Sequence, residues 1–395
     1  MSNENSNKPI YIPKVINHEI IDSGIEYPLV IVDAHSVIHK SKIFQETSST
    51  FKVMIDPVTH HLQYKNKRET TSFQGLPYKD TTDIGRIHAD PTYRLDNLVK
   101  PVIDFQIENG AALIVAPYLC SEEIHSSVFN TNITLVSESI TNLRSRGSGL
   151  PLYAPICTSA RALKEQTTIN AIVDFYTDES IAQHVAGYYV MIADFNDESA
   201  DPDELLGVAN LVYQLSQGKH VIVKQLGAFG YVLNAVSNCS FTSSPAGGEV
   251  FSLKLMNSDF TPRRDHNEWM YVPELYDYVN DFELSEERIG YHCDCASCAG
   301  QFNAESKTKQ RKIHYLLRRE REVQTLMRMS QHEKIDYLLN SFSEAIRFAN
   351  ECISKYGSKL VTQHIYRWSE VLQRARTWNF QEDEKELEAF LKALD

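Results

Sequence analysis

Cysteine is scarce in this chain, which has only seven among its 395 residues. The number is odd, and four of the seven stand singly in apolar or helical segments, as reduced and buried thiols usually do. The pattern therefore argues against a framework of disulfide bonds. The four single cysteines are Cys120, Cys157, Cys239 and Cys352.

Long apolar runs are missing as well. No stretch of the sequence approaches the roughly 18 consecutive apolar residues of a membrane-spanning helix. The polar start, MSNENSNKPIYIPK, lacks the apolar core of a secretory signal. We therefore expect a soluble, cytoplasmic protein that has no contact with a membrane.

Basic residues are in the minority, because 39 Lys and Arg face 52 Asp and Glu, and the net charge is −13. This balance argues against broad, nonspecific attraction to nucleic acid. The charge is unevenly distributed, however, since residues 307–328 hold eight basic and two acidic side chains. Segment 307–328 can therefore contact the phosphates of tRNA or DNA, or it can be an ordinary solvated helix face.

The apolar segments alternate between strand and helix patterns. YPLVIVDAHSVIH, AALIVAPYL, PLYAPICT, YYVMIAD and HVIVKQL are apolar runs of strand length, with helical periodicity between them. Strands that are apolar throughout indicate a parallel sheet covered by helices. We predict an α/β fold, a TIM (β/α)8 barrel followed by C-terminal helices. A doubly wound sheet is the alternative, although neither G-x-G-x-x-G after the first strand nor G-x-x-x-x-G-K-[ST] occurs.

Three of the seven cysteines lie within six residues, in the sequence YHCDCASCAG. Thiolates spaced C-x-C-x-x-C can converge on one tetrahedral Zn²⁺, because a tight turn brings the third sulfur back to the others. We therefore expect Cys293, Cys295 and Cys298 to bind a structural zinc ion, with ordinary or redox-active thiols as the alternative. The downstream candidates for a fourth ligand are His314, His332 and Cys352.

These patterns predict three regions. Residues 1–20 carry too little apolar content to pack, so we expect them to be disordered. Residues 21–290 form the barrel, with a polar, hairpin-like insertion over 45–95. Residues 291–395 form a zinc-binding and helical subdomain, which we expect to dock on the barrel because no Pro- or Ser-rich linker separates the two.

With this cluster in view, the chain resembles the tRNA-guanine transglycosylase family, whose barrels carry a late C-x-C-x-x-C and a zinc-binding histidine on a helix. DNLVKPVIDFQIENGAALIVAPYLCSEE and HVIVKQLGAFGYVLNAVSNCSFTSSPAGGE are similar to its strands and loops, and the resemblance covers about residues 27–350. It implies His332, in RMSQHEKIDYLLNSFSEAI, as the fourth zinc ligand. It also implies a dimer, either homodimer or heterodimer, and a purine or 7-deazapurine base as the bound ligand.

Candidate site residues follow from the same resemblance. The family exchanges guanine for a 7-deazaguanine through an aspartate that attacks the ribose C1′, while a second aspartate handles protons. Asp33 falls at the proton-handling position and Asp194 ends a later strand, so both are catalytic candidates. The substrate-binding candidates are Tyr118, Cys157, Thr158, Gly247 and Gly248.

The nucleophile's expected place departs from the family pattern. It reads NCSFTSSPAGGE, with no carboxylate before Glu249. The hydroxyls of Ser240, Thr242 and Ser243 are poor nucleophiles without an adjacent base, and the sequence indicates none. Strand-end aspartates also have a structural interpretation, because they can cap the following helix.

Two functions therefore stay open. In the first, the protein binds a purine or 7-deazaguanine base and exchanges it in a nucleic acid. In the second, it is a catalytically inactive transglycosylase-like subunit that acts by binding a partner. An accessory role in a deazaguanine-linked antiphage modification system is a variant of the second.

Overall fold

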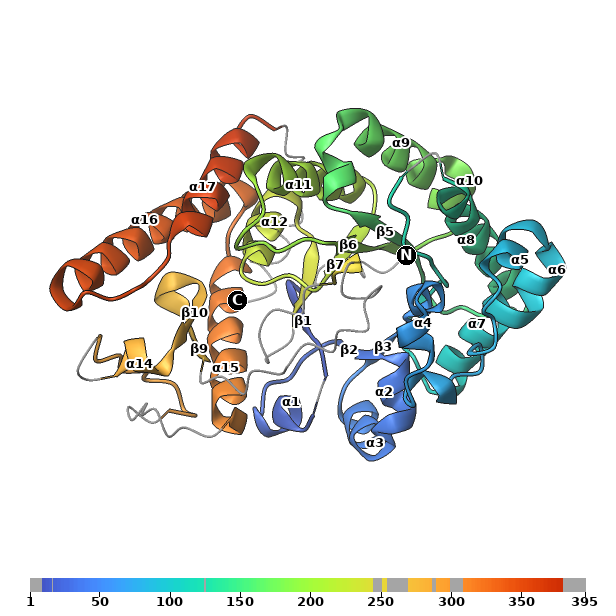
Figure 1. The fold of residues 1–395 in the computed structure, drawn as a ribbon, viewed down its shortest axis with the longest axis horizontal. Helices are drawn as coiled ribbons and strands as arrows, with labels where there is room; N and C mark the ends of the chain where they lie inside the picture. The colour runs from blue at the N-terminus through green and yellow to red at the C-terminus, as the bar shows by residue number, and fades with distance from the viewer. Residues whose placement is uncertain are drawn as a thin grey trace, which may run out of the picture.

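The computed structural model describes residues 9–15, 17–123, 126–243, 251–253, 269–285, 289–298 and 308–378. It is an α/β structure in which parallel strands lie at the centre and helices surround them, as Figure 1 shows. Within these ranges, no helix combines the length and the apolar character needed to cross a bilayer.

Six parallel strands form the main sheet, which is curled like half a barrel and has the order β1-β8-β7-β6-β5-β4. They are β1 (Tyr11–Pro13), β4 (Ile114–Val115), β5 (Leu152–Ser159), β6 (Gly187–Ala193), β7 (His220–Lys224) and β8 (Ser240–Ser243). A second sheet pairs β2 (Val30–Asp33) with β3 (Val53–Asp56) in parallel. This pairing establishes the α/β class and half a barrel, and it does not show the complete eight-stranded barrel that the sequence predicts.

Single parallel bridges join the two sheets at both ends. Lys14, just after β1, bridges Ile31 of β2, and Met54 of β3 bridges Leu113, just before β4. β1 therefore lies beside β2, and β3 lies beside β4, at these two bridges.

Successive residues of the strands face two different apolar clusters. Because side chains alternate along a strand, one set points to the concave side and the other to the helices. The concave cluster includes Ile12, Ile31, Met54, Tyr189 and Ile222. The cluster under the helices includes Tyr11, Val30, Val53, Tyr188 and Val221. Burial on both faces explains why the strands are apolar throughout, as the sequence indicates.

Helices pack on the convex side of the strands. Helix α7 (Lys100–Glu108) contacts β4, α8 (Ser127–Ser145) contacts β5, α11 (Pro202–Ser216) contacts β7 and α12 (Phe229–Ser237) contacts β8. The other helices before residue 243 are α1 (Glu19–Asp22), α2 (Ala34–His39), α3 (Ser41–Thr50), α4 (Lys65–Arg68), α5 (Ile84–Ala89), α6 (Pro91–Arg94), α9 (Gln166–Thr177) and α10 (Glu179–Ala182).

Two local predictions are wrong. Part of the segment 1–20, expected to be disordered, is structured, because Tyr11–Pro13 forms β1 and pairs with β8. The hairpin expected within 45–95 is absent from the described residues, because Val53–Asp56 pairs in parallel with β2. Both strands are too short to show a hydrophobic period of their own, and the pairing partner of each lies elsewhere in the chain.

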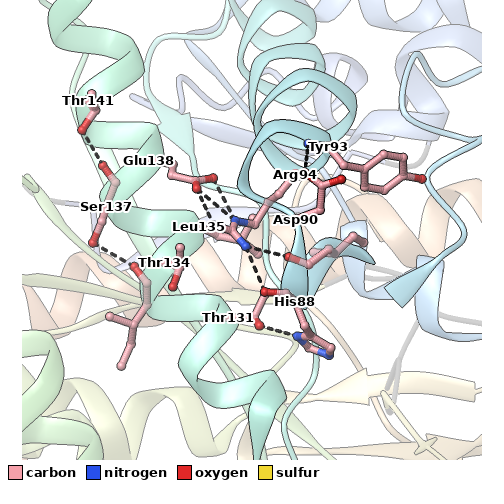
Figure 2. A network of polar contacts seen from close by, with 12 residues as sticks. His88, Asp90, Tyr93, Arg94, Thr131, Thr134, Leu135, Ser137, Glu138 and Thr141 are labelled. Carbon is pink, nitrogen blue, oxygen red and sulfur yellow. Dashed lines mark hydrogen bonds and ion pairs between the residues drawn. The ribbon is translucent and has the colours of Figure 1, made fainter. Parts of the chain in front are cut away.

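A polar network fastens α6 to α8 (Figure 2). Nε of Arg94 donates to both carboxylate oxygens of Glu138 at 3.0 Å, and its Nη1 donates to the carbonyl of Ile87 at 2.8 Å. Arg94 is buried, and it thereby also satisfies a carbonyl at the end of α5. This arginine joins the segment between β3 and β4 to the helical layer.

The C-terminal region packs on α11 and α12. It contains the antiparallel pair β9 (Trp269–Val272) and β10 (Asp277–Asn280), with α14 (Asp281–Leu284), α15 (Thr308–Leu326), α16 (Gln331–Tyr356) and α17 (Gln363–Ala375). Trp368 contacts Phe229 and Trp378 contacts Tyr213, so both tryptophans take part in this packing. The docking of this helical region on the strands and their helices is therefore observed.

A buried arginine lies within this interface. Arg319 of α15 is 1% exposed and lies between three tyrosine rings, with the guanidinium 4.5 Å from the ring centre of Tyr271. Glu322, one turn later, accepts a hydrogen bond from the same Tyr271 hydroxyl at 3.0 Å. The charge of this arginine thus stabilises the docking through cation–π contacts.

Candidate functional site

The three clustered cysteines and His314 converge on one point. Nδ1 of His314 lies 3.3 Å from the sulfurs of Cys293 and Cys298 and 3.4 Å from that of Cys295. All four ligand atoms lie within 4.8 Å of one another. This is a Cys3His group that can hold a metal ion, and it confirms the predicted convergence of the cysteines.

Local structure explains the convergence. A turn between Cys295 and Cys298 is closed by a main-chain hydrogen bond of 3.0 Å, which brings the third sulfur back to the first two. Nε2 of His314 lies 2.7 Å from the carbonyl oxygen of Tyr271 on β9, so Nδ1 is the nitrogen that faces the sulfurs. A hydrogen bond of this kind fixes the tautomer and orientation of a metal-binding imidazole.

The fourth member of the cluster is His314, and the structure does not place His332 in it. His332 lies in the first turn of α16, whereas His314 lies within α15. Arg318, one turn after His314, donates to the Cys293 sulfur at 3.0 Å, so one face of α15 covers the cluster. His314 and Arg318 are four residues apart, a spacing that places both side chains on one face of a helix. This spacing could have favoured His314 over His332 from the sequence alone.

A second group of polar side chains lies where the parallel strands end. Nζ of Lys14 lies 2.8 Å from Asp33, and Nζ of Lys224 lies 3.3 Å from the other oxygen of Asp33 and also contacts Asp56. Lys14, Asp33, Lys224 and Asp56 thus form a buried network in which lysine and aspartate alternate. We call these four residues the strand-end network. Each member lies two residues after a side chain of the concave cluster, because strand side chains alternate.

Asp56 is saturated with hydrogen bonds. The hydroxyls of Tyr118 and Tyr189 donate to its two oxygens at 2.8 and 2.9 Å, and the main-chain N–H of Val58 donates at 2.9 Å. Lys224 contributes the remaining contact. Asp56 therefore holds the network in place, and sequence reasoning had not selected it or either lysine.

Asp33 and Lys224 are held in their charged forms. Burial alone raises the pKa of Asp33, but the ammonium groups of Lys14 and Lys224 outweigh it and hold that pKa well below its usual value. Burial lowers the pKa of Lys224, and the two aspartates more than offset this, so its pKa is raised. Although Asp33 precedes α2, its side chain makes no capping hydrogen bond. The capping interpretation of Asp33 is therefore wrong.

Histidines of the turn η1 (Thr59–Gln63) lie beside this network. The ring of His60 stacks on Tyr118 with centres 5.3 Å apart, and it contacts the ring of His61 at 4.5 Å. Burial is the main cause that lowers the pKa of His60 and of His61 well below the ordinary value, so both rings are neutral near pH 7. Nδ1 of His60 is buried and has no hydrogen-bond partner.

Asp194 is placed differently from the catalytic role that the sequence suggests. Its main-chain N–H donates to the Phe251 carbonyl at 2.7 Å, and its carboxylate accepts from the Leu253 N–H at 2.9 Å. Its backbone is left-handed, with φ of 54°. Asp194 thus fastens residues 251–253, and it is not part of the ion pairs of the strand-end network.

The predicted substrate-binding residues have mixed positions. Tyr118 donates to Asp56 of the strand-end network, and Cys157 is buried in the concave cluster beside Cys120. Thr158 is buried and alternates with Cys157, so it faces away from the concave cluster. Gly247 and Gly248 lie outside the described residues.

Ser240 does have a base beside it, contrary to the sequence interpretation. Its Oγ lies 2.8 Å from Nε2 of His220, whose Nδ1 lies 2.7 Å from the hydroxyl of Tyr153. The serine hydroxyl itself donates to the carbonyl of Pro9. His220 and Ser240 begin β7 and β8, so this buried group lies at the opposite edge from the strand-end network.

Five basic side chains of α15 form ion pairs with acidic side chains of the same chain. The ion pairs are Lys309 with Asp22, Lys312 with Glu19, Arg318 with Asp294, Arg319 with Glu322 and Arg321 with Asp294. Contact of segment 307–328 with tRNA or DNA, and a dimer of this chain, stay predictions.

Comparison with protein-family models and with curated proteins gives no match to this chain.

Proposed function

We propose that this chain is a transglycosylase-like protein that binds a purine or 7-deazaguanine base at the strand-end network. The observation that carries the proposal is the buried alternation of Lys14, Asp33, Lys224 and Asp56 at the carboxyl ends of parallel strands. Sheets of this kind bind their ligands at that edge.

The chemistry of the network suits a guanine-like base. The Watson–Crick edge of such a base presents two adjacent N–H donors beside a carbonyl acceptor. A carboxylate next to an ammonium group offers the complementary set, since the carboxylate accepts and the ammonium donates. Lys14 and Asp33, 2.8 Å apart, supply this pair at one end of the network.

The same geometry favours binding over base exchange. Asp33 and Asp56 both contact Nζ of Lys224, so these carboxylates lie within roughly 6 Å of each other. That separation falls in the range of glycosidase carboxylate pairs, but a lysine occupies the space between the two. A general acid must hold a proton, whereas the neighbouring ammonium groups keep Asp33 ionised. The same ammonium groups also make the Asp33 carboxylate a weak base and a weak nucleophile, so we assign Asp33 to base recognition.

Calorimetric titration with guanine and with 7-deazaguanine tests this function. We expect saturable binding with one site per chain, weakened at least tenfold by Asp33→Asn because a charged hydrogen-bond acceptor is lost. Asp174→Asn, on the exposed side of α9, is the matched control and should bind as the parent does. Equal binding by the parent and Asp33→Asn would contradict the assignment.

Incubation with labelled guanine plus tRNA or DNA separates binding from exchange. Incorporation of label that Asp33→Ala abolishes would establish a transglycosylase. Base binding without incorporation would support the inactive, partner-binding alternative.

For the fold, we propose that the two sheets are parts of one closed (β/α)8 barrel. The support is that bridges join β1 to β2 and β3 to β4, and that both sheets contribute to the same concave cluster. The N–H groups of Val15 and Ala112 donate across these two joins at 2.9 and 2.8 Å. Hydrogen exchange at these two amides as slow as in β6 is the expected result, and rapid exchange would argue for open edges.

For the metal, we propose Zn²⁺. Three thiolates and one imidazole are a set of ligands typical of structural zinc. Tetrahedral Zn–S and Zn–N bonds place nitrogen and sulfur about 3.6 Å apart, close to the 3.3–3.4 Å observed here. Elemental analysis of protein purified without chelator should find one zinc per chain, and a value far below one would contradict the assignment.

A further inference from the structure

Residues 251–253 form a short segment that covers part of the concave side of the strands, and we call it the strap. Phe251 and Leu253 are each 6% exposed and belong to the same cluster as the inward-facing strand residues. The two hydrogen bonds to Asp194 fasten the main chain on either side of Ser252. The strap is therefore attached to the loop that follows β6.

The ring of Phe251 lies against a histidine of the proposed base site. Its centre is 4.8 Å from that of His60, at an interplanar angle of 74°. His60 is 2% exposed, and its ring also contacts that of His61 and stacks on that of Tyr118, whose hydroxyl donates to Asp56. An aromatic series thus leads from the strap to the strand-end network.

One polar atom in this series is unsatisfied. Nδ1 of His60 is buried without a hydrogen-bond partner, which is costly for a ring nitrogen away from water. A buried polar atom without a partner, at the edge of an apolar and aromatic cluster, is an arrangement in which a ligand can complete the hydrogen bonding.

We propose that Phe251 occupies the ring-binding position of the base site, and that a planar nitrogen heterocycle takes its place against His60 with a hydrogen bond to Nδ1. The inference rests on the proposed function and specifies how the base is held. Edge-to-face contact with the imidazole, as Phe251 makes it, accommodates any planar base. The hydrogen bond to Nδ1, which lies in the imidazole plane, selects a heterocycle with a matching polar edge.

Two strap variants measure the competition. Because the strap must leave before a base can bind, the apparent affinity is reduced by the fraction of time the site is open. Phe251→Ala should therefore bind 7-deazaguanine about tenfold more tightly than the parent. Asp194→Gly retains the left-handed backbone but loses the carboxylate, so it should also bind more tightly. Asp194→Asn retains both the backbone preference and an acceptor for Leu253, and it should resemble the parent.

Variants of His60 test the other side of the contact. His60→Phe retains a ring but removes the nitrogen, and in the Phe251→Ala background it should lose the gain in affinity. Circular dichroism and urea unfolding confirm that each variant is folded. Equal affinity of the parent and Phe251→Ala, or no effect of His60→Phe, would overturn the inference while the proposed function stands.

Chemical modification gives a readout that needs no ligand. Diethyl pyrocarbonate reacts with accessible neutral imidazoles, and mass spectrometry locates the product. We expect little reaction at His60 in the parent and at least a fivefold increase in Phe251→Ala. No increase would show that Phe251 does not cover His60 and would overturn the inference. If neither the parent nor any variant binds a base, the proposed function fails. The modification experiment then shows only whether Phe251 covers His60.

Discussion

Nε2 of His314 lies 2.7 Å from the carbonyl oxygen of Tyr271, and this contact determines which imidazole nitrogen faces the three cysteines. The metal cluster is thereby tied to β9 as well as to α15. Its assembly consequently depends on packing between a strand and a helix, through two residues that are 43 positions apart in the chain.

The cluster predicts opposite outcomes for two histidine variants. His314→Ala removes one of four ligands, so we expect loss of bound metal and a lower melting temperature. His332→Ala changes a residue outside the cluster and should retain one metal per chain. Elemental analysis and thermal unfolding with and without chelator measure both. Metal loss in His332→Ala alone would overturn the assignment of His314.

Removal of the central lysine of the strand-end network should strongly destabilise the protein. Lys224→Met leaves two buried aspartates facing an apolar group, at a cost of about 3–5 kcal/mol in the free energy of unfolding. Asp33 retains its ion pair with Lys14, whereas Asp56 loses its ammonium partner. Adding Asp56→Asn removes that uncompensated charge and should restore part of the loss. Urea unfolding measures both variants.

Lys100→Met is the control for that comparison. Its ion pair with Asp96 is largely exposed, so the substitution should lower the free energy of unfolding by less than about 1 kcal/mol. If Lys224→Met were as stable as this control, the ammonium group of Lys224 would not form buried ion pairs with Asp33 and Asp56.

Arg94→Ala should destabilise the attachment of α6 to α8. The substitution removes the double contact with Glu138 and leaves the Ile87 carbonyl without its donor, which together cost about 2–4 kcal/mol. Arg374→Ala, whose pair with Glu370 is exposed, should cost less than about 1 kcal/mol. Comparable effects of the two substitutions in urea unfolding would contradict the importance of the network in Figure 2.

His364 predicts a pH dependence of stability. Burial against Trp368 lowers the pKa of His364 from about 6.5 to about 4, so the folded state holds this ring neutral. The unfolded chain takes up a proton as pH falls below about 6.5, and this favours unfolding. Between pH 7 and pH 5 the histidine therefore removes about 2 kcal/mol from the free energy of unfolding.

Urea unfolding at several pH values tests this prediction. His364→Gln should lose less stability than the parent over this interval, by about 2 kcal/mol. His39→Gln, at an exposed position, should follow the parent. Identical pH profiles for the parent and His364→Gln would show that the ring is accessible to protons in the folded state.

The sequence alone determined features that depend on residues close together in the chain. Cys293, Cys295 and Cys298 lie within six residues, so a single turn decides whether their sulfurs converge. The continuous apolarity of the strands likewise reports burial on both faces, which predicts an α/β fold with parallel strands. Asp33 could be located at a strand end for the same reason.

Only the tertiary structure decided which distant residues meet. Lys224 contacts Asp33 across 191 positions of sequence, and neither residue carries a local sign of the other. The choice of His314 over His332 depended on which face of α15 packs against the cysteines. Asp194 could not be assigned for the same reason, since its hydrogen-bond partner is 59 residues away. Residue spacing and hydrophobic periodicity depend on residues close together in the sequence. The contacts named here join residues far apart in the sequence, and they form only when the strands and helices pack together.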